Sequence, residues 1–197
     1  MAPEQHGLTA DPCCRSLERK YGHVTLLLIA VLLSGCPHLI SLDYVPNNPY
    51  VGQGQVGVDR FEYLPLKRGE LGPRHVEVNP QAAGRFYLSQ TVPEFFAEAV
   101  KRELIHSGYQ VTSSADLEVS GQIERFYYNP VDAQEASIEL IVHYVVRNQE
   151  REMYTQSVKV LRKTSKSLLA VSQLIHVATR ESIHQFLTGA REAKVLK

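Results

Sequence analysis

The stretch "ASIELIVHYVVRN", residues 136–148, decides the fold, because apolar and polar residues alternate along it. Glu139, His143 and Arg147 share one side of this pattern. The opposite side is formed by Ile138, Leu140, Val142, Tyr144 and Val146. Alternation with a period of two predicts a β-strand that has one buried face and one face toward solvent.

Segments on both sides of this strand repeat the pattern. "DLEVSGQIERFYY", residues 116–128, precedes it, and "REMYTQSVKVLRK", residues 151–163, follows it. The connections between the three segments are short, and short connections join antiparallel neighbours. We therefore expect an antiparallel meander with one face covered and one face open.

A further strand and a helix precede the meander. "QVGVDRFEYL", residues 55–64, is rich in strand-forming residues. "TVPEFFAEAVKRELIHSGY", residues 91–109, carries the signals of a helix. Thr91 and Glu94 have the spacing of a capping box, and Gly108 provides a C-terminal stop.

The chain closes with a long amphipathic helix, "SLLAVSQLIHVATRESIHQFL", residues 167–187, which Gly189 can end. Two polar residues fall on or near the apolar stripes of the helices. These are Glu103 in the first helix and Ser182 in the second. Both weaken the local helix prediction.

The resulting order is β-α-β-β-β-α, which predicts the α+β class. We expect a four-stranded mixed or antiparallel sheet with both helices packed on the same face. The loop Pro65–Gln90 is unusually long for a compact domain. It is either functional or contains a short strand around residues 74–78.

The N-terminal quarter has the layout of a secretory signal. Arg15, Arg19 and Lys20 precede the uncharged apolar run Val24–Leu33. This run is too short for a transmembrane helix, which needs about 20 apolar residues. Because a long segment precedes the basic cluster, we expect translation to start nearer Leu17.

The end of the apolar run resembles the lipobox of bacterial lipoproteins. The sequence there is Leu33, Ser34, Gly35 and Cys36. In that family the cysteine thiol receives a diacylglycerol, and cleavage occurs before it. The resemblance implies a covalent lipid on Cys36, and we expect no other cofactor. An ordinary buried cysteine is the alternative.

These features divide the chain into four parts. We expect a lipoprotein signal peptide at 1–35, a flexible tether at 36–55, one α+β domain at 56–190 and a tail at 191–197. The tether contains a literal G-x-G-x-x-G at Gly52, Gly54 and Gly57. No strand is expected before it and no helix after it, so this motif does not predict a dinucleotide site.

Composition and motifs favour a binding protein over an enzyme. The 21 basic and 21 acidic residues balance, which argues against a nucleic-acid partner. Among the eight histidines there is no H-E-x-x-H, and no metal site is expected. We find no set of residues that would serve as a catalytic site, although a periplasmic enzyme stays a third hypothesis.

Four basic residues gather near the end of the last predicted strand. They are Lys159, Arg162, Lys163 and Lys166. One interpretation is an edge strand that lysines protect against pairing with another sheet. The other is an anionic-surface patch that meets lipid phosphates or an acidic partner.

The order of lipobox, tether, strand, helix ending in "SGY", three strands and helix ending in "HQFL" resembles the YajG family of small bacterial lipoproteins. It also looks like the broader group of transport-auxiliary lipoproteins that includes LptE and PqiC. The resemblance implies a non-enzymatic envelope protein that faces the periplasm and binds an envelope protein partner.

Pro37 follows Cys36 where an inner-membrane retention aspartate would stand in enterobacterial lipoproteins, which suggests the outer membrane. Two functions remain open at this point. One is a lipid-anchored scaffold that docks a membrane complex. The other is a lipid or glycolipid carrier with a pocket between the helices and the sheet.

Overall fold

The computed structural model describes residues 38–47, 49, 51–81, 85–130, 135–165 and 168–197. The expected signal peptide, the lipobox-like residues 33–35, Cys36 and Lys166 lie outside the described residues.

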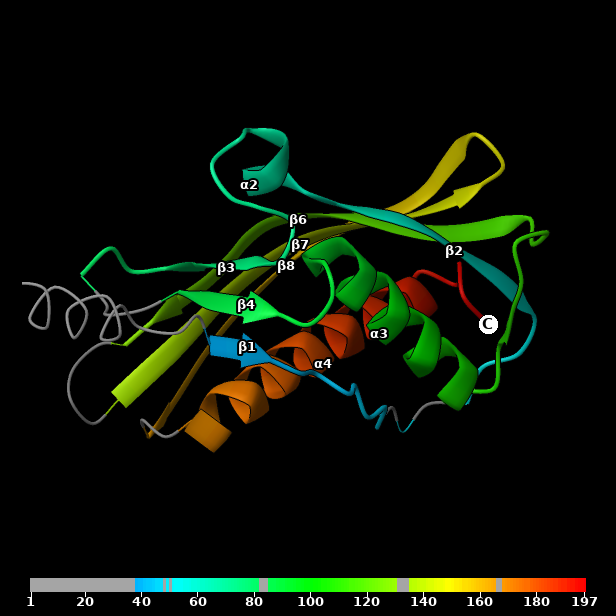
Figure 1. Cartoon of the computed structure of the whole chain (residues 1–197). Coiled ribbons are helices and arrows are strands. Elements are labelled where there is room, and N and C mark those ends of the chain that lie inside the picture. The colour runs from blue at the N-terminus through cyan, green and yellow to red at the C-terminus, as the bar shows by residue number, and fades with distance from the viewer. Residues whose placement is uncertain (1–37, 48, 50, 82–84, 131–134, 166–167) are drawn as a thin grey trace, which may run out of the picture. The chain divides into compact units, whose positions relative to one another are not determined.

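The described part of the chain is an α+β fold with a mixed sheet of eight strands and three helices (Figure 1). The strands are β1 (His38–Ile40), β2 (Gln55–Tyr63), β3 (His75–Val78), β4 (Phe86–Leu88), β5 (Gln110–Val111), β6 (Leu117–Asn129), β7 (Glu135–Asn148) and β8 (Arg151–Ser165). The helices are α2 (Leu64–Lys67), α3 (Val92–His106) and α4 (Leu168–Glu192). The α+β class was correctly predicted, but the expected number of four strands was wrong. The additional strands β1, β3, β4 and β5 are two to four residues long, too short for a periodic pattern to reveal.

The predicted meander is confirmed, because β6, β7 and β8 pair antiparallel in this order. The other edge of β6 is shared by two strands. β2 pairs in parallel with residues 118–123 of β6, and β3 pairs in parallel with residues 127–128. The loop 65–90 thus does contain the strand suggested near residues 74–78, together with α2 and β4. The strands β3 and β4 of this loop extend the sheet, and β1 pairs with β4 at the edge.

A β-bulge at Glu124 decides which side chains of β6 are buried. Ile123 pairs with Val142 and Arg125 with Ile141, so Glu124 has no counterpart on β7. An extra residue shifts the alternation by one position. As a result Phe126 is buried on the same face as Ile123, and Arg125 lies on the other face.

Both long helices cover one face of the sheet, as expected (Figure 1). The core lies between them and the strands. Tyr144 of β7 stacks on Phe186 of α4 with ring centroids 4.5 Å apart, and its hydroxyl lies 2.9 Å from that of Ser182. Ser182 therefore interrupts the apolar stripe of α4 because it provides the partner of a buried tyrosine.

The predicted capping box and the two predicted C-terminal glycines had different outcomes. The capping box of Thr91 and Glu94 is present at the start of α3, and Gly108 follows this helix with a φ of +92°. Gly189 does not end the last helix, because α4 continues to Glu192. Gly189 instead allows close packing, since a Cβ there would lie 2.2 Å from the hydroxyl oxygen of Tyr154.

No helix within the described residues is long and apolar enough to cross a membrane.

Candidate functional site: the groove between the two helices

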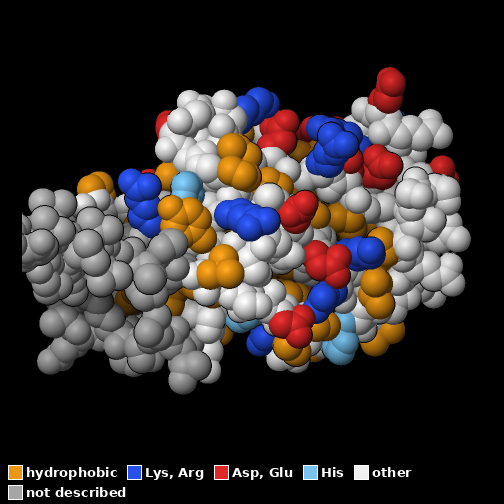
Figure 2. Space-filling view, viewed as in Figure 1, with side chains coloured by type: hydrophobic (Ala, Val, Ile, Leu, Met, Phe, Trp, Pro, Cys, Tyr) orange, Lys and Arg blue, Asp and Glu red, His pale blue; other side chains and the backbone are white. Residues whose placement is uncertain are grey.

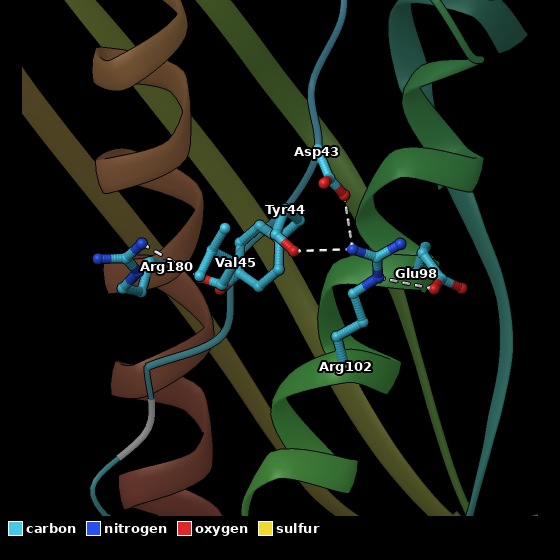
Figure 3. A network of polar contacts seen from close by, with 6 residues as sticks. All are labelled: Asp43, Tyr44, Val45, Glu98, Arg102 and Arg180. Atoms are coloured by element: carbon cyan, nitrogen blue, oxygen red, sulfur yellow. Dashed lines mark hydrogen bonds and ion pairs between the residues drawn. The ribbon is translucent and has the colours of Figure 1, made fainter.

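After β1 the chain passes between α3 and α4 (Figure 3), and we call the place where the two helices hold it the groove. After β1, residues 41–45 run extended, and alternate side chains point into the groove. Leu42 and Tyr44 are 7% and 3% exposed, whereas Ser41, Asp43 and Val45 face solvent. We call residues 42–47 the docked segment. It follows Cys36 by only a few residues, so this groove is where the N-terminal part of the chain is fastened to the domain.

Tyr44 fills the centre of the groove. Its hydroxyl donates a hydrogen bond to Oε1 of Glu103 on α3, at 2.6 Å. Its ring lies edge-on to Phe95 of α3 and near His176 of α4, with centroids 6.4 and 6.2 Å away. Tyr44 therefore contacts both helices. These contacts bury it, although the segment around it is rich in Pro and Asn.

Glu103 is a fully buried carboxylate with several partners. Besides Tyr44, its Oε1 accepts a hydrogen bond from the backbone N–H of Asn47 at 3.2 Å, and Nε2 of His184 lies 3.7 Å away. Burial acts to raise the pKa of Glu103, but the contacts with His184, Tyr44 and Asn47 outweigh it and lower this pKa. The carboxylate is thus ionised and holds the docked segment against α3.

The pKa of Tyr44 is raised well above its ordinary value, first by burial and then by the adjacent carboxylate of Glu103. Its hydroxyl therefore stays protonated and remains a hydrogen-bond donor. A proton on Tyr44 and a charge on Glu103 are the states that this bond requires.

Two arginines hold the backbone of the docked segment from opposite sides (Figure 3). Nη1 of Arg102 on α3 donates to Oδ1 of Asp43 at 2.8 Å and to the carbonyl of Tyr44 at 2.9 Å. Nη2 of Arg180 on α4 donates to the carbonyl of Val45 at 3.1 Å. Glu98 orients Arg102 through a further hydrogen bond of 2.9 Å.

The docked segment differs from the flexible tether expected at 36–55. The composition of this stretch is typical of a linker, but Leu42 and Tyr44 are buried in the groove. The sequence signal for this docking was a leucine and a tyrosine two positions apart. Two apolar residues are too few to predict a buried segment among Pro and Asn.

The glycines that follow are also part of the packing. The N–H of Gly52 donates to the carbonyl of Ser107, and the carbonyl of Gly54 accepts from the N–H of Gln110. A Cβ on Gly52 would lie 2.1 Å from Cε2 of Tyr109. This glycine is needed because the backbone passes close to the end of α3.

A pocket of about 580 Å³ is lined by residues of α4 and of β8. Arg180 and His184 line it and also contact the docked segment or Glu103. The remaining lining residues are mostly polar: Gln156, Arg162, Val177, Glu181, Gln185, Thr188, Gly189 and Glu192. Such a lining suits a polar ligand or a protein surface better than an acyl chain.

Of the four basic residues singled out in the sequence, the structure describes Lys159, Arg162 and Lys163, and these three do not share one face of the sheet. β8 is an edge strand in the described sheet. Lys159 lies on the open face, 2.7 Å from Glu139, whereas Arg162 lies on the helix face and pairs with Glu181. Lys163 is exposed on the open face at the end of the strand. Figure 2 shows acidic and basic side chains interspersed over the helix side of the molecule.

His143 of β7 and the two histidines of α4 lie on opposite sides of the sheet. His143 lies on the open sheet face, as expected, with Nε2 2.6 Å from Oε2 of Glu124. His184 belongs to the groove, and burial lowers the pKa of His176. Within the described ranges no group of three or more His, Cys, Asp or Glu side chains could hold a metal ion.

The arrangement of two helices over a mixed sheet is a known fold. A protein from Xanthomonas campestris of the family described as DUF330 superposes with a TM-score of 0.58 at 15% identity, over 80% of this chain and 96% of its own. An uncharacterized protein gives 0.52 at 12% identity, over 79% and 99%. A minor lipoprotein from Acinetobacter baumannii has a TM-score of only 0.39 at 12% identity, over 75% of this chain and 96% of its own, which is too low to establish a shared fold. No family model matches the chain, and no curated protein matches it. The chain therefore shares the fold of the DUF330 protein, at an identity that establishes the fold alone.

Proposed function

We propose that this protein is a lipid-anchored lipoprotein of the cell envelope. In this proposal, lipid on Cys36 holds it on a membrane, and the domain acts as a non-catalytic scaffold that binds an envelope protein partner. One observation carries the proposal above all. The lipobox-like cysteine stands two residues before His38, where β1 begins. The expected processing site thus coincides with the border of the folded domain.

The shared fold supports the same proposal. The DUF330 protein matches over nearly its whole length, so the likeness covers a complete domain. The sequence resembles the YajG family and the group that includes LptE and PqiC, whose members work by binding in outer-membrane or lipid-transport assemblies. We infer a similar role here, with the outer membrane and the periplasmic side as the proposed location.

The groove chemistry supports binding over catalysis. Glu103 is the most buried acid in the groove, with 0% exposure, and its contacts hold the docked segment. A carboxylate that no solvent reaches has no access to a substrate. Its lowered pKa also keeps it ionised, as a structural acceptor must be.

The packing favours the scaffold over the lipid carrier. The space between the helices and the sheet holds Phe96, Phe126, Tyr144 and Phe186, each with 0% exposure. Phe96 contacts Phe126 edge-on at 5.7 Å, and Tyr144 stacks on Phe186. An acyl chain in this space would have to displace packed aromatic rings.

The test compares Cys36→Ala with the matched control Cys13→Ala in a cell that processes lipoproteins. We expect palmitate labelling and membrane attachment to disappear together in Cys36→Ala and to persist in Cys13→Ala, because residue 13 lies before the expected cleavage site. A Cys36→Ala protein that is still labelled and attached would rule out the proposed anchor. Cross-linking in the same membranes then tests the scaffold role, which fails if no reproducible protein partner is captured.

A further inference from the structure

One end of the sheet gathers several strand termini around the start of β1 (Figure 1). β1 pairs in parallel with β4, which places His38 beside Phe86. β3 ends against Tyr128 near the end of β6, and the last residues of β8 pair with the start of β7. We call this end of the domain, with Leu39, Arg85 and Lys163, the anchor end.

The distance between the lipid and the anchor end is fixed by the chain. Only Pro37 separates Cys36 from His38, and an extended chain spans at most about 3.6 Å per residue. The Cα of His38 therefore lies within about 7 Å of the Cα of the residue that would carry the lipid. The expected 20-residue tether would have allowed a reach of roughly 25 Å.

β1 cannot easily move away from the domain to lengthen this link. It is hydrogen-bonded to β4, and it is followed directly by the docked segment. Detaching that segment exposes Leu42 and Tyr44, breaks the bond between Tyr44 and Glu103, and releases Arg102 from Asp43. The short link to Cys36 and the attachment of the docked segment together keep the anchor end close to the expected lipid.

The surface at this end suits a phospholipid layer. Leu39 is 66% exposed, although it lies in a strand. Arg85, just before β4, and Lys163, near the end of β8, are both exposed. An exposed apolar side chain and exposed cations at the same end of a domain favour contact with the headgroup region of an anionic membrane.

We propose that the anchor end rests directly on the phospholipid surface, with Leu39 inserted at the level of the headgroups and with Arg85 and Lys163 facing lipid phosphates. This inference rests on the proposed lipidation of Cys36 and adds an orientation to it. The far end of the domain, with the β7–β8 hairpin, then points away from the membrane and is available to a partner.

The experiment uses tryptophan fluorescence, because the chain contains no natural Trp. Leu39→Trp and the control Met153→Trp are prepared as full-length, processed proteins in vesicles that contain brominated phosphatidylcholine and an anionic lipid. Met153 is also exposed, at 44%, but it lies ten residues before Lys163 on β8, roughly 33 Å along the strand. We expect quenching of about half the fluorescence in Leu39→Trp and almost none in Met153→Trp.

Two further variants test the cause. Inserting about ten Gly and Ser residues between Pro37 and His38 should largely remove the quenching in Leu39→Trp, because the domain can then leave the surface. Arg85→Glu combined with Lys163→Glu should reduce it, whereas Arg60→Glu, at an exposed site of β2, should not.

The outcomes separate this inference from the proposed function. If the protein is lipid-labelled and sediments with the vesicles, but Leu39→Trp and Met153→Trp are quenched equally, the orientation is wrong and the anchor stands. Quenching that the insertion leaves unchanged also overturns the orientation. Protein that is neither labelled nor attached overturns both proposals.

Discussion

Tyr44 and Glu103 are 59 residues apart in the chain, and a hydrogen bond of 2.6 Å joins them in the groove between α3 and α4. Through this bond the docked segment, which follows the lipobox-like residues, is fixed to the interior of the domain. The attachment adds to the pairing of β1 with β4, which lies between Cys36 and Tyr44.

Tyr44→Phe removes the hydroxyl and leaves the ring in the groove. We expect the free energy of unfolding to fall by about 1.5–3 kcal/mol, because a buried carboxylate loses a hydrogen-bond donor. Urea unfolding measures the change. Tyr87→Phe, at a half-buried tyrosine of β4, is the control and should change it by less than about 0.5 kcal/mol. Equal effects of the two substitutions would mean that the bond contributes nothing.

The stability of the protein should fall at acid pH because of Glu103. The folded protein lowers the pKa of this residue below the ordinary value of 4.5. A lowered carboxyl pKa contributes stability above 4.5, and this contribution is lost as the pH falls through the lower folded value. Urea midpoints from about pH 6 to about pH 3 should decline less in Glu103→Gln than in the wild type. A parallel decline in both proteins would assign the acid sensitivity to other carboxylates.

Arg102→Gln should loosen the docked segment without unfolding the domain. Arg102 is partly exposed and bonds Asp43 and the carbonyl of Tyr44. We expect faster amide hydrogen exchange at Asn47, whose N–H is hydrogen-bonded in the groove, and a change in global stability of less than about 1 kcal/mol. Arg60→Gln, at an exposed site of β2, is the control. Unchanged exchange at Asn47 would show that Arg102 does not hold the segment.

Gly52→Ala should destabilise the domain through one contact with Tyr109. The added methyl would lie 2.1 Å from the ring, so we expect a loss of about 1–3 kcal/mol in the free energy of unfolding. The same substitution in a Tyr109→Ala background should cost less than about half as much, since the ring is gone. If both backgrounds give the same loss, backbone strain and not the ring is the cause.

Deleting Glu124 should preserve cooperative unfolding. The strand then alternates regularly, with Arg125 still on the open face and Phe126 still on the buried face. Deleting Ser120, at a regular position of β6, instead turns Ile123 to the open face, so it should abolish the cooperative transition. Thermal unfolding followed by circular dichroism distinguishes the two proteins. The bulge does not set the register if the Glu124 deletion loses its cooperative transition and the Ser120 deletion keeps it.

Local patterns were enough to predict most of the framework. The alternation in 136–148 identified β7 and its buried face, and the capping box located the start of α3. Long-range contacts were not accessible in the same way. In the sequence, the bulge at Glu124 appears only as one residue that breaks the alternation of β6. Ser182 interrupts the apolar stripe of α4, and its role is visible only from its hydrogen bond with Tyr144 in the folded domain. Glu103 likewise weakened a helix prediction, although its burial is what the groove requires.

The sequence by itself determined the α+β class, the order of the long elements, and the lipobox-like residues before Cys36, because these depend on neighbours a few positions apart. Only the tertiary structure decided the fate of residues 42–47. A short segment with two apolar side chains is a linker unless a groove exists to receive them, and that groove is built by helices more than 50 and more than 120 residues away. Burial of Tyr44 against Glu103 fixes these residues to the domain, and no local sequence pattern predicts that contact.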